Sequence, residues 1–302
     1  MKLAGKVGII TGAGRGIGRS LALAMAREGA ALVVNDAGVT VDGSPEQERP
    51  AHGVVAQING EGGAAIVDEG NVASFAATER MVALAQTEFG RLDFVVNNAG
   101  IVRDRIFHKM SEDDWDAVLA VHLKGTFNLC RAAAGVFRDQ GSGAILNMTS
   151  TSGLIGNVGQ ANYAAAKLGI VALTRSVALD LNRFNVRANA IAPFAWTRIT
   201  GTLPEGDAAA KQRIERLQRL SADHVAPLAV HLVSDGASTI SGQVFAVRGA
   251  EIVLFSLPRP LATIYQPGGW DAASLATRLK ALESQFIPLA VTSDVFPDEP
   301  RL

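Results

Sequence analysis

Short runs of apolar, often β-branched residues alternate along this chain with longer amphipathic stretches, over about the first 250 residues. The apolar runs show little internal alternation with polar residues, which is typical of strands that are buried on both faces. Strands separated by helices in this way predict a parallel sheet covered by helices on both sides. We therefore expect an α/β protein with a doubly wound, Rossmann-like sheet of seven strands.

The periodicity places each element of this sheet approximately. The predicted strands are Val7–Thr11, Leu32–Asn35, Ala64–Val67, Phe94–Asn97, Ala144–Met148, Ala188–Ile191 and Val244–Val247. The predicted helices are Gly18–Arg27, Phe75–Phe89, Asp113–Phe137, Tyr163–Leu181 and Ala222–Val233.

The composition excludes several kinds of partner. Of the 302 residues, 48% are hydrophobic, and the formal net charge of -1 gives no indication of binding to a polyanion such as nucleic acid. No apolar run approaches the roughly 20 residues of a membrane span, and the N-terminus lacks the features of a signal peptide. The single Cys130 fits a reducing compartment. A cytoplasmic protein with no membrane partner is expected.

The chain divides at about residue 250, where the strand–helix alternation stops. Residues 1–250 are expected to form the nucleotide-binding domain, and residues 251–302 an extension packed on the same domain or on a partner subunit. In the extension, Asp271–Phe286 has a helical pattern with one apolar face. Two long connections, 37–52 and 198–221, follow predicted strands, and each is either a substrate lid or a plain insertion.

The segment TGAGRGIG, residues 11–18, follows the first predicted strand and opens the first helix. It does not match G-x-G-x-x-G, because Ile17 stands where the third glycine is required. It matches T-G-x-x-x-G-x-G through Gly12, Gly16 and Gly18. Glycines there let the backbone approach a pyrophosphate, and the helix N-terminus supplies free N–H groups. The loop predicts dinucleotide binding, although many tight turns are also rich in glycine.

Two charged residues bear on which dinucleotide binds. Asp36 ends the second predicted strand, where a carboxylate accepts hydrogen bonds from the adenosine ribose and repels a 2′-phosphate. Arg15, inside the loop, favours the opposite choice because a cation there holds that phosphate. Close contact between like charges costs more than an exposed arginine gains, so NAD is expected and NADP is less favoured.

The segment NYAAAKLG, residues 162–169, holds one of only two tyrosines one helical turn before a lysine. A free phenol has a pKa of about 10, and both the Lys167 ammonium and an oxidised nicotinamide are expected to lower it. Tyr163 then takes the proton of an alcohol while hydride leaves for the nicotinamide, and Lys167 bonds the nicotinamide ribose. Taken alone, such a pair is also common on ordinary helix surfaces.

The reaction also needs a hydroxyl that holds the substrate oxygen. Ser150 follows the fifth predicted strand, at the sheet edge that also carries the glycine loop. Its neighbours Thr149, Thr151 and Ser152 have the same chemistry, and spacing does not choose among the four.

Together these residues resemble the short-chain dehydrogenase/reductase family over about the first 250 residues. The resemblance rests on TGAGRGIG, on NNAG at 97–100, on Ser150, on Tyr163-x-x-x-Lys167 and on NAIAP ending at Pro193. It implies NAD(P)-dependent oxidoreduction of a secondary alcohol or ketone, with Ser150 orienting the substrate, Tyr163 as acid and base, and Lys167 tuning the tyrosine. The cofactor-binding residues that it implies are Gly12, Arg15, Gly16, Ile17, Gly18, Asp36, Asn71, Val72, Asn97, Ala99, Gly100, Tyr163, Lys167 and Thr197, with no metal ion.

The chain departs from the family pattern at two positions. His122 stands where the family usually has an asparagine that fixes a water for proton relay, and we expect the imidazole to take that relay role rather than a purely structural one. Phe194 stands where the family has a glycine after Pro193, which puts the local backbone contacts to the nicotinamide in doubt.

A closer resemblance concerns the substrate. Segments 33–38, 101–107, 121–127 and 156–169 resemble the (3R)-hydroxyacyl-CoA dehydrogenase domain of peroxisomal multifunctional enzymes and its bacterial relatives. This implies NAD-dependent oxidation of a (3R)-3-hydroxyacyl-CoA by a homodimer or homotetramer. The alternatives are a dehydrogenase of another bulky, steroid-derived alcohol and an NADPH-dependent 3-oxoacyl reductase. A cofactor sensor without turnover ranks low, because such proteins usually lose the tyrosine or the lysine.

Overall fold

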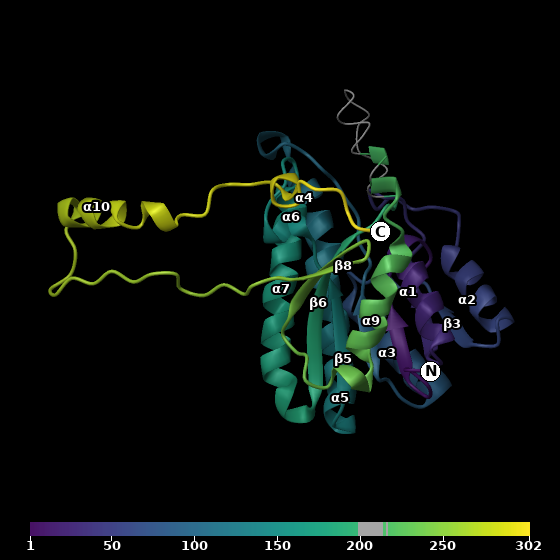
Figure 1. The fold of residues 1–302 in the computed structure, drawn as a ribbon. Helices are drawn as coiled ribbons and strands as arrows, with labels where there is room; N and C mark the ends of the chain where they lie inside the picture. The colour runs from purple at the N-terminus through teal and green to yellow at the C-terminus, as the bar shows by residue number, and fades with distance from the viewer. Residues whose placement is uncertain (199–213, 216) are drawn as a thin grey trace.

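The computed structural model describes residues 1–198, 214–215 and 217–302. One sheet runs in the order β3-β2-β1-β4-β5-β6-β7-β8 through the centre of the molecule (Figure 1). Its strands are β1 Val7–Ile10, β2 Ala31–Asn35, β3 Ala64–Asp68, β4 Phe94–Asn97, β5 Gly143–Met148, β6 Val186–Phe194, β7 Val244–Arg248 and β8 Glu251–Leu254.

The first seven strands are parallel, which confirms the predicted doubly wound sheet. β8 was not predicted. It pairs antiparallel with β7, and the two strands are joined by a tight turn in which Gly249 has a φ of 61°. Because β8 lies beyond residue 250, the expected extension contributes an edge strand to the sheet, and the division of the chain at residue 250 stays a prediction.

Neighbouring residues of the central strands enter opposite cores. In β2, Leu32 and Val34 belong to one core and Val33 to the other, because successive side chains of a strand point to opposite faces. This is why the apolar runs are continuous. The helices of the first core are α1 Gly16–Arg27, α2 Pro50–Gly60 and α9 Ala226–Val233, and those of the second are α3 Phe75–Phe89, α5 Gly125–Gln140 and α7 Ala161–Leu181.

One helix was missed and one predicted helix needs correction. Helix α2 was not predicted; it begins at Pro50, near the end of the 37–52 connection, and proline is well suited to the first helical turn. The predicted helix Asp113–Phe137 is interrupted. Helix α4, Glu112–Leu119, starts at a capping box between Ser111 and Asp114, and a π-helical turn, Ala120–Lys124, separates it from α5.

Short helical segments complete the described fold. They are the 3-10 turns Phe107–Lys109, Asn182–Phe184, Ala222–Val225, Asp235–Ala237 and Glu283–Gln285, and the helices α6 Thr151–Leu154, α10 Ala272–Lys280 and α11 Thr292–Val295. Most of the second long connection, 198–221, which was expected to be either a substrate lid or a plain insertion, lies outside the described residues.

The C-terminal extension leaves the domain and returns to it (Figure 1). Its middle part carries α10, which is shorter than the predicted helix and has side chains that are exposed or half-buried. The end of the chain docks on the sheet domain: Ala250 N donates to Arg301 O at 2.7 Å, and the rings of Phe194 and Phe296 lie 5.2 Å apart. Phe194, the departure from the family pattern, therefore helps to anchor the tail.

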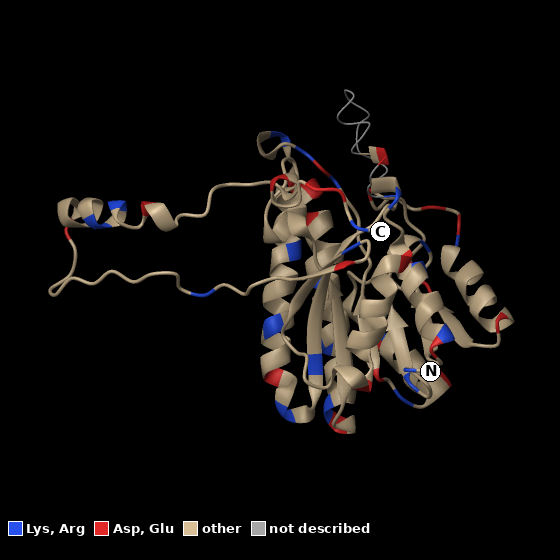
Figure 2. Cartoon of the chain, viewed as in Figure 1, with Lys and Arg blue, Asp and Glu red and all other residues tan. Residues whose placement is uncertain are grey.

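Figure 2 shows that Lys, Arg, Asp and Glu are scattered over both halves of the molecule. Among the helices in the described part of the chain, none combines the length and the apolar character needed to cross a lipid bilayer.

Candidate active site

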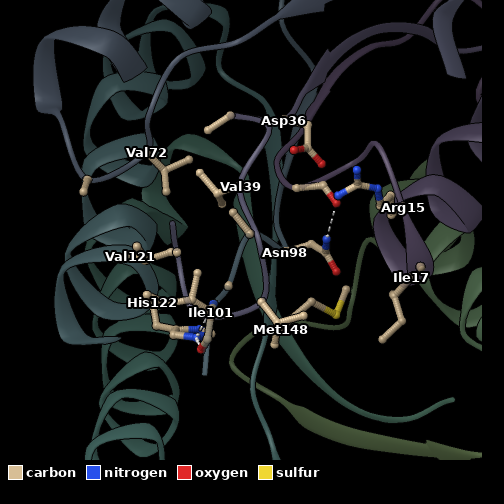
Figure 3. Close-up of a pocket in the computed structure, with 18 of the residues that line it drawn as sticks. Arg15, Ile17, Asp36, Val39, Val72, Asn98, Ile101, Val121, His122 and Met148 are labelled. Carbon is tan, nitrogen blue, oxygen red and sulfur yellow. Dashed lines mark hydrogen bonds between the residues drawn. The ribbon is translucent and has the colours of Figure 1, made fainter. Parts of the chain in front are cut away.

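A cavity of about 400 Å³ opens at the carboxyl ends of the central strands. It lies beside β1 and β4, where the strand order reverses, which is where ligands bind in open α/β sheets. Figure 3 shows side chains from both sides of this reversal around the cavity, with Asp36 and Arg15 well separated from His122. The predicted residues that line it are Gly12, Arg15, Gly16, Ile17, Asp36, Asn71, Val72, Ala99, Gly100, His122, Tyr163, Lys167 and Thr197.

The loop between β1 and α1 has the backbone that its glycines permit. Gly12 and Gly16 have φ values of 61° and 52°, in the left-handed region that favours glycine. A Cβ on Gly12 would lie 2.7 Å from Ala99 Cα, and one on Gly18 would lie 2.2 Å from Gly12 O. Gly18 thus serves packing within the loop. At Gly16 the nearest atom to such a Cβ is in Thr197, at 3.5 Å, so this glycine faces the cavity.

The start of α1 is suited to a phosphate. Arg15 is its N-cap, and within the described residues no side chain caps this end, so first-turn N–H groups remain available for an anion. Next to it, the Asp36 carboxylate accepts hydrogen bonds from Gly14 N at 3.0 Å and Gly38 N at 2.9 Å. A carboxylate has further acceptor sites for ribose hydroxyls. The loop and Asp36 therefore fit the pyrophosphate and the adenosine ribose of a nicotinamide dinucleotide.

In the NNAG segment, one asparagine lies in the core and the other lines the cavity. Asn97 is buried, and its Nδ2 donates to Asn147 Oδ1 at 2.9 Å, so its side chain does not line the cavity. Asn98 does, and its Nδ2 donates to Thr11 O and Gly12 O, both at 3.0 Å. Asn98 was missed in the sequence analysis. Its position directly after β4 could have indicated that it lines the cavity, because ligands bind where the chain leaves the carboxyl ends of the strands.

The structure places Tyr163 and Lys167 together on α7. Lys167 Nζ lies 5.4 Å from the centroid of the Tyr163 ring and donates to Met148 O at 2.7 Å. Burial lowers the pKa of Lys167 to about 7. Burial also raises the pKa of Tyr163 to about 12, and a hydrogen bond with Ser150 opposes that rise. In the protein alone, burial therefore dominates the pKa of Tyr163, and the lowering expected from Lys167 together with an oxidised nicotinamide stays a prediction.

The hydrogen bonds distinguish the four hydroxyls after β5. Ser150 is the one of the four that acts on the Tyr163 phenol, whose pKa it lowers against the effect of burial, and its Oγ also donates to Ser152 Oγ at 3.3 Å. Thr149 Oγ1 donates to Lys167 O at 2.7 Å, and Ser152 Oγ donates to Gln160 Oε1 at 2.8 Å. Thr151 is buried at the start of α6. Ser150 is thus the one of the four that influences Tyr163, although its side chain is not among those that line the cavity.

His122 lies in the π-helical turn, a local geometry that is often found at functional sites. The side chain is 2% exposed, and its Nε2 lies 2.7 Å from Ile101 O and 3.1 Å from Ile101 N. Among the described residues, no partner hydrogen-bonds to its buried Nδ1. Burial, together with the charge of Lys167, lowers the pKa of His122 to about 3. The imidazole therefore stays neutral and keeps one nitrogen for a water or a ligand.

Asn162 was missed in the sequence analysis, although it directly precedes Tyr163. Its side chain is fully buried. Its Nδ2 donates to Arg103 O at 3.0 Å and Asp114 O at 2.9 Å, and its Oδ1 accepts from Tyr163 N at 2.8 Å. These bonds tie the first turn of α7 to the segments after β4 and thereby orient Tyr163.

Comparisons with known proteins agree with this geometry. The family model described as Enoyl-(Acyl carrier protein) reductase matches residues 12–249. The chain is 40% identical to hydroxyacyl-CoA dehydrogenase ChsB1 of Mycobacterium tuberculosis, covering 92% of this chain and 88% of that protein. It is 41% identical to peroxisomal multifunctional enzyme type 2 of Mus musculus, covering 87% of this chain and 34% of that protein.

A solved structure is also similar. The crystal structure of a short chain dehydrogenase from Mycobacterium avium superposes with a TM-score of 0.83 at 40% identity and covers 96% of this chain and 99% of that one. Likeness of this extent, in sequence and in structure, together with a tyrosine, a lysine and a serine converging beside a dinucleotide-type glycine loop, leads to one conclusion. The chain belongs to the short-chain dehydrogenase/reductase family and is an oxidoreductase that acts on CH–OH groups.

Proposed function

We propose that this protein oxidises a (3R)-3-hydroxyacyl-CoA to the 3-oxoacyl-CoA with NAD. The position of Tyr163 and Lys167 together in the cavity lining carries the proposal, because it places a phenol and an amine beside the nucleotide loop where an alcohol oxygen can bind. The hydroxyacyl-CoA activity named for the relative from M. tuberculosis supports the substrate class. Asp36 at the ribose end of the cavity supports NAD over NADP.

The roles of the residues follow from their positions. Ser150 donates a hydrogen bond to the substrate oxygen. Tyr163, as the phenolate, takes the proton from the substrate hydroxyl as the carbonyl forms and becomes the neutral phenol. A bound NAD supplies the acceptor for the hydride that leaves the carbinol carbon. The positive charge of an oxidised nicotinamide would also lower the pKa of Tyr163, which burial raises to about 12 in the protein alone. Lys167 holds the nicotinamide ribose, and the free Nδ1 of His122 holds a water for proton relay.

We take the loop that follows β4 as the entrance for an acyl-CoA, because Arg103 of this loop lines the cavity. Arg105 N donates to Gly159 O at 2.8 Å, which joins the loops that follow β4 and α6. These joined loops expose Ile106, Phe107 and Val158. An apolar rim next to an exposed guanidinium, that of Arg105, matches an acyl chain attached to a phosphorylated carrier.

We also propose that the chain works as a dimer or tetramer and that the projecting part of the extension packs on a partner copy. Leu168 and Leu179 on α7 and Phe127 on α5 are 50%, 79% and 47% exposed, and in the extension Phe286 is 62% exposed. Large apolar side chains gathered on neighbouring helices mark association surfaces. A monomeric mass in light scattering at micromolar concentration would contradict this assembly.

A substrate panel tests the proposed reaction. Formation of reduced nicotinamide is followed with (3R)- and (3S)-3-hydroxyacyl-CoA, free hydroxysteroids and steroid-derived CoA thioesters, with NAD or NADP. We expect the highest kcat/KM with the (3R)-acyl-CoA and NAD. Turnover of free steroids alone would overturn the acyl-CoA assignment, and coenzyme binding without turnover of any alcohol would indicate a sensor.

A further inference from the structure

The first part of the connection after β2 folds back onto the ribose end of the cavity. Asp36 Oδ1 accepts from Gly38 N at 2.9 Å, and Gly38 O accepts from Glu46 N at 2.9 Å. An antiparallel bridge between Val39 and Pro45 closes the same loop. One bond to the Asp36 carboxylate and one backbone bond therefore fix the Glu46 backbone relative to Asp36, so the glutamate is held in place rather than left on a free loop.

The returning segment delivers two carboxylates to Arg15. Arg15 Nη1 donates to Glu46 Oε2 at 2.7 Å, and its Nη2 donates to Glu48 Oε2. The Arg15 side chain is only 19% exposed. Glu46 also lies 3.5 Å from Arg198 Nη1, so it draws two guanidinium groups to itself. Arg15 lines the cavity next to Asp36, where a free guanidinium would favour the 2′-phosphate of NADP.

This pairing changes what Arg15 offers to a ligand. A phosphate monoester carries close to two negative charges and seeks the paired N–H groups of a guanidinium. Both terminal nitrogens of Arg15 already donate to carboxylates. A 2′-phosphate at this end meets Asp36, Glu46 and Glu48 with Arg15 already neutralised, and like charges at short range repel it.

We propose that Glu46 and Glu48 determine coenzyme selectivity by sequestering Arg15, so that the ribose site rejects a 2′-phosphate. The inference rests on the proposed use of NAD. It adds two residues that lie well beyond the strand-end carboxylate, and it assigns a role to the part of the 37–52 connection that precedes α2.

The test separates coenzyme selectivity from catalysis. Calorimetry measures the Kd of 5′-AMP and of adenosine 2′,5′-bisphosphate, neither of which contains nicotinamide or takes part in turnover. The variants are Glu46→Gln, Glu48→Gln, the double variant, and the double variant with Arg15→Ala. The control is Glu61→Gln, because Glu61 forms a similar bridge with Arg27 at 3.3 Å outside the cavity lining.

We expect the double variant to lower the ratio of the bisphosphate Kd to the AMP Kd by about tenfold or more, since one charge-assisted hydrogen bond is worth that much. Adding Arg15→Ala should restore the wild-type ratio, and the single variants should fall between. An unchanged ratio in the double variant overturns the proposal. So does a gain that survives Arg15→Ala, or one that Glu61→Gln reproduces.

Failure of this inference is distinct from failure of the proposed reaction. If the wild-type protein binds 5′-AMP but no variant changes the ratio, only the selectivity role is lost, whatever the substrate panel shows. If the wild-type protein binds neither nucleotide, the coenzyme site itself is overturned, and the selectivity role falls with it.

Discussion

The imidazole of His122 stands edge-on to the phenol ring of Tyr163, with ring centroids 5.1 Å apart and ring planes at 90°. The contact joins the π-helical turn before α5 to the first turn of α7. It places a neutral, buried imidazole against the residue that exchanges the substrate proton. This contact therefore links the protonation state of His122 and the packing around it to the residue that carries out proton exchange.

Replacing Tyr163 with phenylalanine removes the proton acceptor and little volume. We expect kcat to fall about 10²- to 10⁴-fold, the usual contribution of a positioned acid or base. The Kd of NADH, followed by its fluorescence, should change less than threefold, or by roughly 0.6 kcal/mol. Tyr265→Phe is the matched control, because Tyr265 is 80% exposed in the extension. Near wild-type turnover by Tyr163→Phe would refute the role of the phenol.

Ser150→Ala should lower kcat about 10²-fold, because one hydrogen bond to the developing carbonyl oxygen is lost. Ser152→Ala should lower it much less, since Ser152 Oγ is directed to Gln160 rather than to Tyr163. Steady-state kinetics on both variants provides the comparison. Equal losses would show that the hydrogen bonds do not identify the orienting hydroxyl.

Acid should destabilise the protein through His122. Because the folded-state pKa of His122 is depressed from 6.5 to about 3, only the unfolded chain takes up this proton between those values. Stability is therefore fully present above pH 6.5 and declines as the pH falls. Between pH 7 and pH 5 wild type should lose about 2 kcal/mol more than His122→Asn in urea unfolding. His52→Asn, at an exposed side chain, should behave as wild type; identical losses in wild type and His122→Asn would count against this account.

The imidazole of His122 leaves no room for a side chain at position 100, which is a glycine. A Cβ there would lie 2.3 Å from His122 Cε1, so Gly100→Ala should cost about 1–3 kcal/mol of unfolding free energy. Most of that cost should vanish in the His122→Ala background, which a double-mutant cycle measures. Gly135→Ala, on α5 with open space around it, should be neutral or stabilising. Additive effects of the two substitutions would mean that the clash is not with His122.

The local sequence pattern predicts most strands of the sheet and part of the candidate active site. Continuous apolar runs such as the one containing Val33 predict strands covered on both faces, and the sheet is built from them. The glycine loop and the Tyr163–Lys167 spacing predict a nucleotide fold and a proton-exchanging pair because both depend on residues close in sequence. The resemblance to a known family then supplied the expected substrate class.

The tertiary structure decided what depends on residues far apart in the chain. Burial, which no local pattern reports, raises the pKa of Tyr163 although Lys167 lies one turn away. Only the fold separates Ser150 from three similar hydroxyls, or turns Asn97 into the core and Asn98 towards the cavity. The pairing of Arg15 with Glu46 likewise appears only once the connection after β2 folds back. Sequence spacing determines which groups share a helix or strand, whereas desolvation and long-range hydrogen bonds exist only when the packed chain has excluded water.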